Sequence, residues 1–198
     1  MRGRSNGYST VKEWWMRVIG GSAKGTRLYG AKGYRVRPIT DRVKGSLFDF
    51  LGDTVEGTGV LDLFAGVGSL GIEALSRGAE HADFIEKHRA TALSIVKNLE
   101  RARLAGAGRV MVAELPGGLR RARGTYGLIF VDPPFRIEWR LLEELFRFIR
   151  MRGLLGPGGI VVYRHSPKSG YEPPTEEWAL AERRDYGDSV IFMYRMSD

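Results

Sequence analysis

The sequence has 198 residues, a length that fits one α/β domain with a modest appendage. Hydrophobic residues form 43% and charged residues 27% of the composition, which predicts a packed globular core and excludes a disordered chain. The absence of cysteine excludes disulfides and thiolate metal sites, and the three histidines lack the spacing of metal ligands. No apolar run reaches the roughly 18 to 20 residues of a membrane span, and no apolar leader is recognisable. We expect a cytoplasmic monomer without a metal ion.

The net charge of +8 is concentrated near the N-terminus. Residues 1–52 contain eleven Lys and Arg against three Asp and Glu, whereas residues 53–198 contain twenty of each kind. A basic segment attached to an electrically balanced domain is typical of an arm that binds phosphates. A solvated basic tail is the alternative interpretation.

The first predicted elements belong to this basic segment. Residues 1–15 show no clean period, and we expect them to be poorly ordered. From Arg17, two short β segments surround a glycine-rich turn, and Thr40 or Asp41 then caps a helix that ends at Leu51. We divide the chain into an extension over 1–15, a basic segment over 16–52 and a larger domain over 53–198.

The larger domain alternates apolar runs with amphipathic stretches, which predicts an α/β fold with a doubly wound, mostly parallel sheet. Strands are expected over Gly59 to Phe64, Ala82 to Ile85, Val110 to Ala113, Leu128 to Val131 and Ile160 to Tyr163. Helices are expected over Leu70 to Arg77, Arg89 to Arg103, a short piece near Leu119, and Arg140 to Met151. A C-terminal antiparallel hairpin is expected from Trp178 to Tyr186 and Ser189 to Met196, which flank a Gly-Asp turn.

A glycine-rich loop joins the first predicted strand of this domain to a helix. Gly66, Gly68 and Gly71 form a G-x-G-x-x-G pattern in the segment D-L-F-A-G-V-G-S-L-G. Glycines in this position let the backbone turn tightly and approach a ligand at the carboxyl end of the strands. The pattern favours a nucleotide-type cofactor over a merely structural turn.

Two acidic residues accompany the loop. Glu86 ends the next strand, twenty residues after Gly66, where a carboxylate can accept hydrogen bonds from ribose hydroxyls of NAD or of S-adenosylmethionine. Asp62 lies beside the loop, where it suits the ammonium group of S-adenosylmethionine and opposes a pyrophosphate. The alternatives are that Asp62 caps backbone amides of its own loop and that Glu86 is a solvated acid at a strand end.

The segment L-I-F-V-D-P-P-F brings an acid, two prolines and an aromatic ring to the same crevice. An exocyclic base amine is a poor nucleophile because its lone pair is delocalised into the ring. Asp132 and the carbonyl of Pro133 can each accept one of its N–H groups, while Pro134 helps to fix the backbone and Phe135 can stack on the base. A structural turn is the alternative, and His165 is expected to cap a sheet edge rather than to act in catalysis.

Together these motifs resemble those of a known family, the bacterial 16S ribosomal RNA guanine-N2 methyltransferases of the RsmD type. The resemblance extends from Met16 to about Arg195 and includes the blocks M-R-V-I-G-G-S-A-K-G-T-R-L, V-R-P-I-T-D-R-V-K-G-S-L-F-D-F-L, V-L-D-L-F-A-G-V-G-S-L-G-I-E-A-L-S-R-G-A and V-D-P-P-F. D-P-P-F alone equally suits adenine-N6 or cytosine-N4 methylation, whereas the basic blocks ahead of the glycine loop favour the ribosomal family.

The resemblance implies transfer of a methyl group from S-adenosylmethionine to the N2 amine of a guanine in 16S rRNA, as free RNA or in an assembling small subunit. It implies a Rossmann-like methyltransferase domain over 53–198 and an RNA-binding extension over 16–52. The residues expected to bind the donor are Asp62, Phe64, Ala65, Gly66, Gly68, Glu86 and Glu114. Those expected to bind the amine are Asp132, Pro133, Pro134 and Phe135. Those expected to contact RNA are Lys24, Arg27, Arg37 and Arg42.

Two positions depart from the family pattern. Glu114 stands where members usually have the Asp that meets the adenine amine, and Gly45 stands where they tend to have Glu. Glycine costs roughly 1 kcal/mol in a helix interior, so Gly45 puts the stability of its helix in question.

Three other functions stay open at this point. One is adenine-N6 or cytosine-N4 methylation of DNA or RNA, and another is a nucleic-acid-binding module with a vestigial donor site. The third is an NAD-dependent reductase, which Asp62 and the lack of a Tyr-x-x-x-Lys pattern disfavour.

Overall fold

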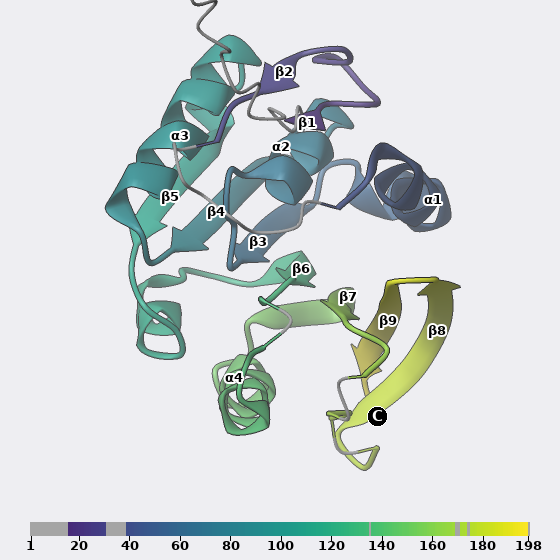
Figure 1. Cartoon of the computed structure of the whole chain (residues 1–198). Helices are drawn as coiled ribbons and strands as arrows, with labels where there is room; N and C mark the ends of the chain where they lie inside the picture. The colour runs from purple at the N-terminus through teal and green to yellow at the C-terminus, as the bar shows by residue number, and fades with distance from the viewer. Residues whose placement is uncertain (1–15, 31–38, 135, 169–170, 174, 198) are drawn as a thin grey trace, which may run out of the picture.

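The computed structural model describes residues 16–30, 39–134, 136–168, 171–173 and 175–197. Its main feature is a seven-stranded sheet in the order β5-β4-β3-β6-β7-β9-β8, with helices on both faces (Figure 1). The parallel strands are β3 (Gly59–Leu63), β4 (His81–Glu86), β5 (Gly108–Val112), β6 (Tyr126–Val131) and β7 (Leu155–His165). The antiparallel strands are β8 (Trp178–Tyr186) and β9 (Ser189–Met196). The predicted doubly wound sheet with a C-terminal hairpin is confirmed.

The helices follow the predicted order. They are α1 (Asp41–Leu51), α2 (Ser69–Ser76), α3 (Arg89–Arg101) and α4 (Trp139–Met151). Thr40 is the N-cap of α1, because its Oγ1 accepts a hydrogen bond from the amide of Val43 at 3.3 Å. The short piece predicted near Leu119 is a 3₁₀ helix, Gly117–Arg121, and two further 3₁₀ helices cover Gly52–Val55 and Ala105–Ala107.

Strand β7 begins five residues earlier than predicted. The sequence L-G-P-G-G looks like a turn, but Leu155 pairs with Tyr126, and the register then shifts before Leu128 pairs with Ile160. The glycine-rich piece is therefore an irregular entrance to the strand, where a bulge accommodates residues that a regular ladder does not.

Two hydrophobic cores cover the two faces of the sheet. In β6, Leu128 and Phe130 belong to the core shared with α1, α2 and α3, whereas Ile129 and Val131 belong to the core shared with α4. This alternation follows from the period of two along a strand. Because both faces are covered, the strands are held rigidly and their carboxyl ends form a fixed edge.

The N-terminal segment packs onto the first of these cores. Strands β1 (Met16–Arg17) and β2 (Arg27–Leu28) form an antiparallel pair, and Leu28 is buried in this core. On α2, the fully buried carboxylate of Glu73 accepts hydrogen bonds from the amides of Ile19 and Gly20, both at 2.8 Å. These hydrogen bonds fix the N-terminal segment to α2.

One basic residue of this region is structural. The side chain of Lys44 is buried, with its Nζ 3.2 Å from Glu73 Oε2 and 2.6 Å from the carbonyl oxygen of Arg17. Burial lowers the pKa of Lys44, and the adjacent Glu73 carboxylate opposes that shift. Lys44 therefore contributes to the positive charge of the sequence without presenting that charge to a ligand.

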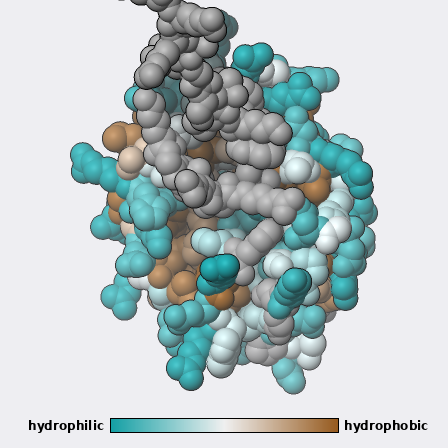
Figure 2. Space-filling view, in the orientation of Figure 1, coloured by the Kyte–Doolittle hydropathy of each residue, from teal (hydrophilic) through white to brown (hydrophobic). Residues whose placement is uncertain are grey.

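The surface is mixed. Hydrophilic side chains surround most of the rim of the face in Figure 2, with smaller hydrophobic patches between them. Among the helices of the described ranges, none combines the length and the apolar composition that a membrane span requires.

Candidate active site

The two predicted loops meet at one edge of the sheet. Strand β3 lies between β4 and β6, and Leu63 pairs with Ile85 on one side and with Val131 on the other. The glycine loop follows β3, Glu86 ends β4 and Asp132 follows β6, so all three stand at the carboxyl ends of neighbouring parallel strands. Ligands of open α/β sheets bind at such an edge.

The glycine loop has the backbone that the sequence predicts. Phe64, Gly66 and Gly68 have φ values of 60°, 58° and 82°, in the left-handed region that favours glycine. Phe64 adopts this conformation without being a glycine, a strain that is typical of functional loops. The amide of Ala65 donates to the carbonyl oxygen of Ile85 at 3.0 Å, which ties the loop to β4.

Gly71 permits the close approach of α2 to the sheet. A Cβ atom at this position would lie 2.3 Å from Cε1 of Phe84, so only glycine fits. The third glycine of the pattern therefore serves helix packing, as in dinucleotide-binding folds.

Asp62 is buried beneath the loop. Its Oδ2 accepts a hydrogen bond from the amide of Gly71 at 3.0 Å, so the capping contact considered as an alternative does exist. The pKa of Asp62 is raised to about 8, mainly by burial; the Gly71 amide opposes this shift, and the nearby carboxylates of Asp132 and Glu86 add to it. A buried carboxyl group in this state favours a cationic ligand, because a positive charge would stabilise its ionised form.

Glu86 is buried as well, at 5% exposure, so the alternative of a solvated acid at a strand end is wrong. Its Oε2 accepts from the amide of Gly66 at 3.0 Å and its Oε1 from the amide of His88 at 2.8 Å. The carboxylate thus positions the glycine loop, and each oxygen keeps a lone pair for a further donor. Glu114 is exposed and follows β5, the strand next to β4, at the same edge.

The second predicted loop contains an ion pair that the sequence analysis missed. Arg164 Nε and Nη2 donate to the two carboxylate oxygens of Asp132 at 2.7 and 2.9 Å. The side chains are 8% and 16% exposed. Val131 pairs with Tyr163, so the next residues, Asp132 and Arg164, lie side by side. The one signal in the sequence is an arginine directly after the apolar run I-V-V-Y, which ends a buried strand.

The prolines shape the rest of this loop. Pro133 is buried and Pro134 is exposed, and the carbonyl oxygen of Pro134 accepts from the amide of Ile137 at 3.0 Å. Phe135, which the sequence predicts as the stacking ring, lies outside the described residues.

His165 lies in an aromatic stack beside this loop. Its ring is between Tyr163, at 4.9 Å, and Phe192, at 5.1 Å. Because Nδ1 is 2.6 Å from the carbonyl oxygen of Ser166, which can only accept, the proton is assigned to Nδ1. Burial lowers the pKa of His165 and favours the neutral ring.

Three of the four residues predicted to contact RNA lie in the described ranges, and all three are exposed. Lys24 and Arg27 are exposed in the N-terminal segment, and Arg42 is exposed on α1. No described carboxylate lies within ion-pair distance of Arg42, whereas Arg17 pairs with Asp41 at 2.7 Å. Arg37 lies outside the described residues. Within the described ranges, no group of three or more His, Asp or Glu side chains is arranged to hold a metal ion.

Known proteins are similar to this chain in sequence and in fold. The family described as "Conserved hypothetical protein 95" matches residues 16–195. The "Ribosomal RNA small subunit methyltransferase D" of Escherichia coli K12 is 33% identical over 91% of this chain and 89% of its own length. The chain belongs to this family. The predicted membership of the RsmD-type methyltransferases is therefore confirmed.

Solved structures have the same fold. "Putative methyltransferase yhhF" from Escherichia coli superposes with a TM-score of 0.82 at 33% identity, covering 93% of this chain and 99% of its own. An RNA methyltransferase from Salinibacter ruber, solved in complex with S-adenosyl-L-homocysteine, has the same fold with a TM-score of 0.62 at 17% identity, covering 82% and 95%.

Proposed function

We propose that this protein transfers the methyl group of S-adenosylmethionine to the exocyclic N2 amine of a guanine in 16S ribosomal RNA. The name of the Escherichia coli relative, "Ribosomal RNA small subunit methyltransferase D", supports small-subunit rRNA as the substrate. The N2 amine of guanine rests on the resemblance to the RsmD-type family. The observation that supports the chemistry is the meeting of three carboxylates, those of Asp62, Glu86 and Asp132, at one edge of the sheet beside a glycine bend. An enzyme with this substrate acts where ribosomes assemble, in the cytoplasm.

The donor fits the residues present. S-adenosylmethionine supplies an electrophilic methyl group on a positively charged sulfur. Asp62 would bind the ammonium of its methionine part, since no cationic side chain of the described residues pairs with this buried carboxyl group. Glu86 would accept from the ribose hydroxyls, and the backbone from Phe64 to Gly68 would let the ligand approach closely.

Asp132 would accept one N–H of the target amine and so make the nitrogen lone pair available. The donor would supply its methyl group to this lone pair, so that an N–C bond replaces the C–S bond and S-adenosylhomocysteine leaves. The amine proton becomes acidic only in this step and can leave to Asp132 or water, so no strong base is required. The Pro133 carbonyl would accept the second N–H, and stacking by Phe135 rests on the sequence alone.

Positioning of the amine should lower the activation free energy of methyl transfer more than any single hydrogen bond does. Alignment of the amine with the methyl group can contribute roughly 7 to 11 kcal/mol, whereas one charged hydrogen bond contributes about 1.5 to 3 kcal/mol. Arg164 serves this alignment through Asp132, because the bidentate guanidinium fixes the plane of the Asp132 carboxylate.

The test is methyl incorporation from labelled S-adenosylmethionine, followed by mass spectrometry of the nucleosides. The substrates are free 16S rRNA and small subunits from cells that lack the enzyme, and duplex DNA is the comparison. We expect N2-methylguanosine in RNA with the wild-type protein and a strongly reduced yield with Asp132→Ala. N6-methyladenine or N4-methylcytosine as the product would contradict the proposed target, and failure to bind the donor in calorimetry would contradict the enzymatic function.

A further inference from the structure

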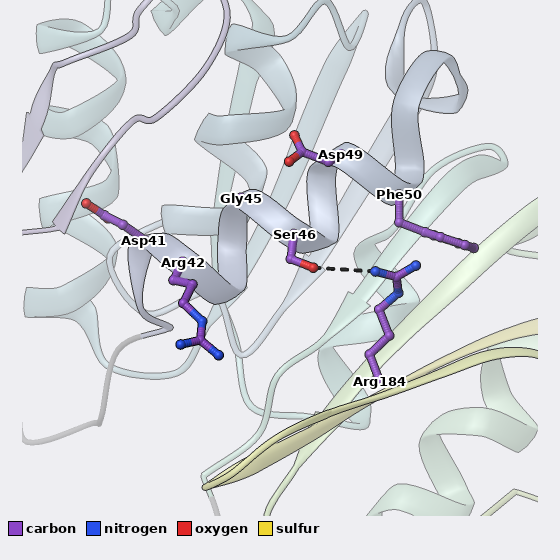
Figure 3. Close-up of a pocket in the computed structure, with 7 residues that line it drawn as sticks. All are labelled: Asp41, Arg42, Gly45, Ser46, Asp49, Phe50 and Arg184. Atoms are coloured by element: carbon purple, nitrogen blue, oxygen red, sulfur yellow. Dashed lines mark hydrogen bonds between the residues drawn. The ribbon is translucent and has the colours of Figure 1, made fainter.

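A shallow groove lies between α1 and β8. Figure 3 shows the helix above and Arg184 of β8 pointing toward it from below. Ser46 and Phe50 of α1 line the groove together with Arg42. Among these side chains, only Arg42 is one of the residues that the sequence predicts to contact RNA.

Arg184 and Phe50 form a flat platform in this groove. The guanidinium carbon of Arg184 lies 4.7 Å from the centre of the Phe50 ring. Its Nη1 donates to Ser46 Oγ at 3.4 Å, and its Nε lies 3.2 Å from Glu182 Oε1. The Phe50 ring and the contact with Ser46 favour one orientation of the guanidinium before any ligand binds.

The platform is continuous with the proposed active site. Arg184 pairs with Ile191 of β9, which in turn pairs with Arg164 of β7, the partner of Asp132. Residues that pair directly across a sheet project from the same face. With strands about 4.8 Å apart, Arg184 begins about 10 Å from Arg164, a distance that a short piece of single-stranded RNA spans.

The charges of the groove fit one phosphate rather than many. Asp41 is paired with Arg17 at 2.7 Å, and Asp49 lies 3.8 Å from Arg77. Since no described carboxylate pairs with Arg42, this exposed cation is available for a single phosphate.

We propose that the groove binds a nucleotide adjacent to the target in single-stranded RNA. The base stacks on the guanidinium plane of Arg184, which Phe50 supports, and the phosphate contacts Arg42. Stacking on arginine planes and aromatic rings is the usual way in which proteins hold unpaired bases. This inference rests on the proposed function and assigns part of its substrate to a defined surface.

The test separates stacking from charge. Arg184→Lys keeps the positive charge but removes the plane, so we expect the KM for 16S rRNA to rise roughly fivefold to a hundredfold. The kcat at saturating RNA and the Kd for S-adenosylmethionine should stay unchanged. Phe50→Leu should raise the KM in the same direction. The matched control is Arg152→Lys. The guanidinium carbon of Arg152 lies 5.7 Å from the centre of the Phe148 ring, so this pair resembles Arg184 and Phe50, but α4 covers the opposite face of the sheet. The control should leave the KM for 16S rRNA unchanged.

Salt dependence tests the phosphate contact. Arg42→Ala should lower the slope of log Kd against log salt by about 0.7, whereas Arg184→Lys should leave the slope unchanged. Melting curves of each variant establish that it is folded, which these partly exposed positions permit. A wild-type KM for Arg184→Lys together with a raised KM for Arg184→Ala would show that Arg184 binds a phosphate and would overturn the stacking proposal.

The two proposals can fail separately. Binding of a fluorescent single-stranded RNA can be measured without methyl transfer. If the wild-type protein methylates no rRNA but Arg184→Lys still weakens RNA binding, the proposed function is contradicted and the proposal that the groove binds RNA is supported. If the wild-type protein methylates rRNA and every groove variant keeps the wild-type KM and Kd, the groove proposal fails alone.

Discussion

Arg164 of β7 holds both carboxylate oxygens of Asp132, at 2.7 and 2.9 Å, across the pairing of β6 and β7. The arginine therefore fixes the orientation of the group that is proposed to receive the target amine. Arg164 is a positioning residue, since it acts through Asp132.

Arg164→Met should lower kcat about tenfold to a hundredfold, because the carboxylate loses a charged bidentate contact. The Kd for S-adenosylmethionine should change little, and Arg164→Lys should recover part of the loss. The double variant Asp132→Asn/Arg164→Met should be no slower than Asp132→Asn alone, since the two residues act as one unit. Arg150→Met, which breaks an exposed ion pair with Glu177, is the matched control. Additive losses in the double variant would show that Arg164 acts independently of Asp132.

The pKa of about 8 for Asp62 predicts pH-dependent donor binding. If the ammonium of S-adenosylmethionine binds the ionised carboxylate, binding must release the Asp62 proton. The Kd should therefore fall about tenfold between pH 6 and 7 and level off above pH 8. Calorimetry in buffers of different ionisation enthalpy measures the released proton. Asp62→Asn should bind S-adenosylmethionine more weakly than the wild type at pH 8, and its Kd should keep only the pH dependence of the ligand itself. If the Kd of this variant depended on pH as in the wild type, the assigned contact would be excluded.

The same group affects stability without ligand. The folded protein binds the Asp62 proton more tightly than the unfolded chain, because the folded pKa is raised from 3.8 to about 8. The contribution of this group to stability is therefore lost as the pH rises from about 4 to about 8. Asp62→Asn should have a higher Tm than the wild type at pH 8, and the difference should shrink at pH 5. A constant difference across this range would contradict the raised pKa.

Helix α1 contains Gly45 in its interior, yet it is continuous over its eleven residues. A Cβ atom at this position would make an ordinary contact, 3.5 Å from Cδ1 of Ile19. Gly45→Ala should therefore raise the free energy of unfolding by about 0.5 to 1 kcal/mol. Gly71→Ala provides the contrast and should destabilise the protein, because its Cβ would overlap Phe84. Chemical denaturation measures both, and a lower stability for Gly45→Ala would contradict the packing described.

Lys44 and Lys24 should behave in opposite ways. Lys44→Met removes the buried partner of Glu73, so it should lower the free energy of unfolding by about 1 to 3 kcal/mol and leave the salt dependence of RNA binding unchanged. Lys24→Ala, at an exposed position, should leave stability unchanged and reduce the salt slope by about 0.7. Denaturation and RNA titrations at several salt concentrations test both, and a reduced slope for Lys44→Met in its folded state would contradict the structural role.

The order of strands and helices along the chain, the glycine bend, the family and the segments of the site could all be predicted from the sequence. Periodicity, caps and turn residues act over a few positions, so they can be recognised locally. Asp62, Glu86 and Asp132 could be placed at one edge because parallel strands present their carboxyl ends together. The irregular entrance of β7 was missed, since its glycines and proline look like a turn.

Which charged side chains pair with one another became visible only in the folded protein. Arg164 and Asp132 are 32 positions apart, and Arg184 and Ser46 are 138 apart, so no local pattern relates them. The sequence also gives Lys44 and Lys24 the same charge, although one is buried against Glu73 and the other is exposed. The physical reason is that strand register and helix packing set burial and long-range pairing, and burial and pairing decide whether a charged side chain stabilises the fold or remains available to a ligand.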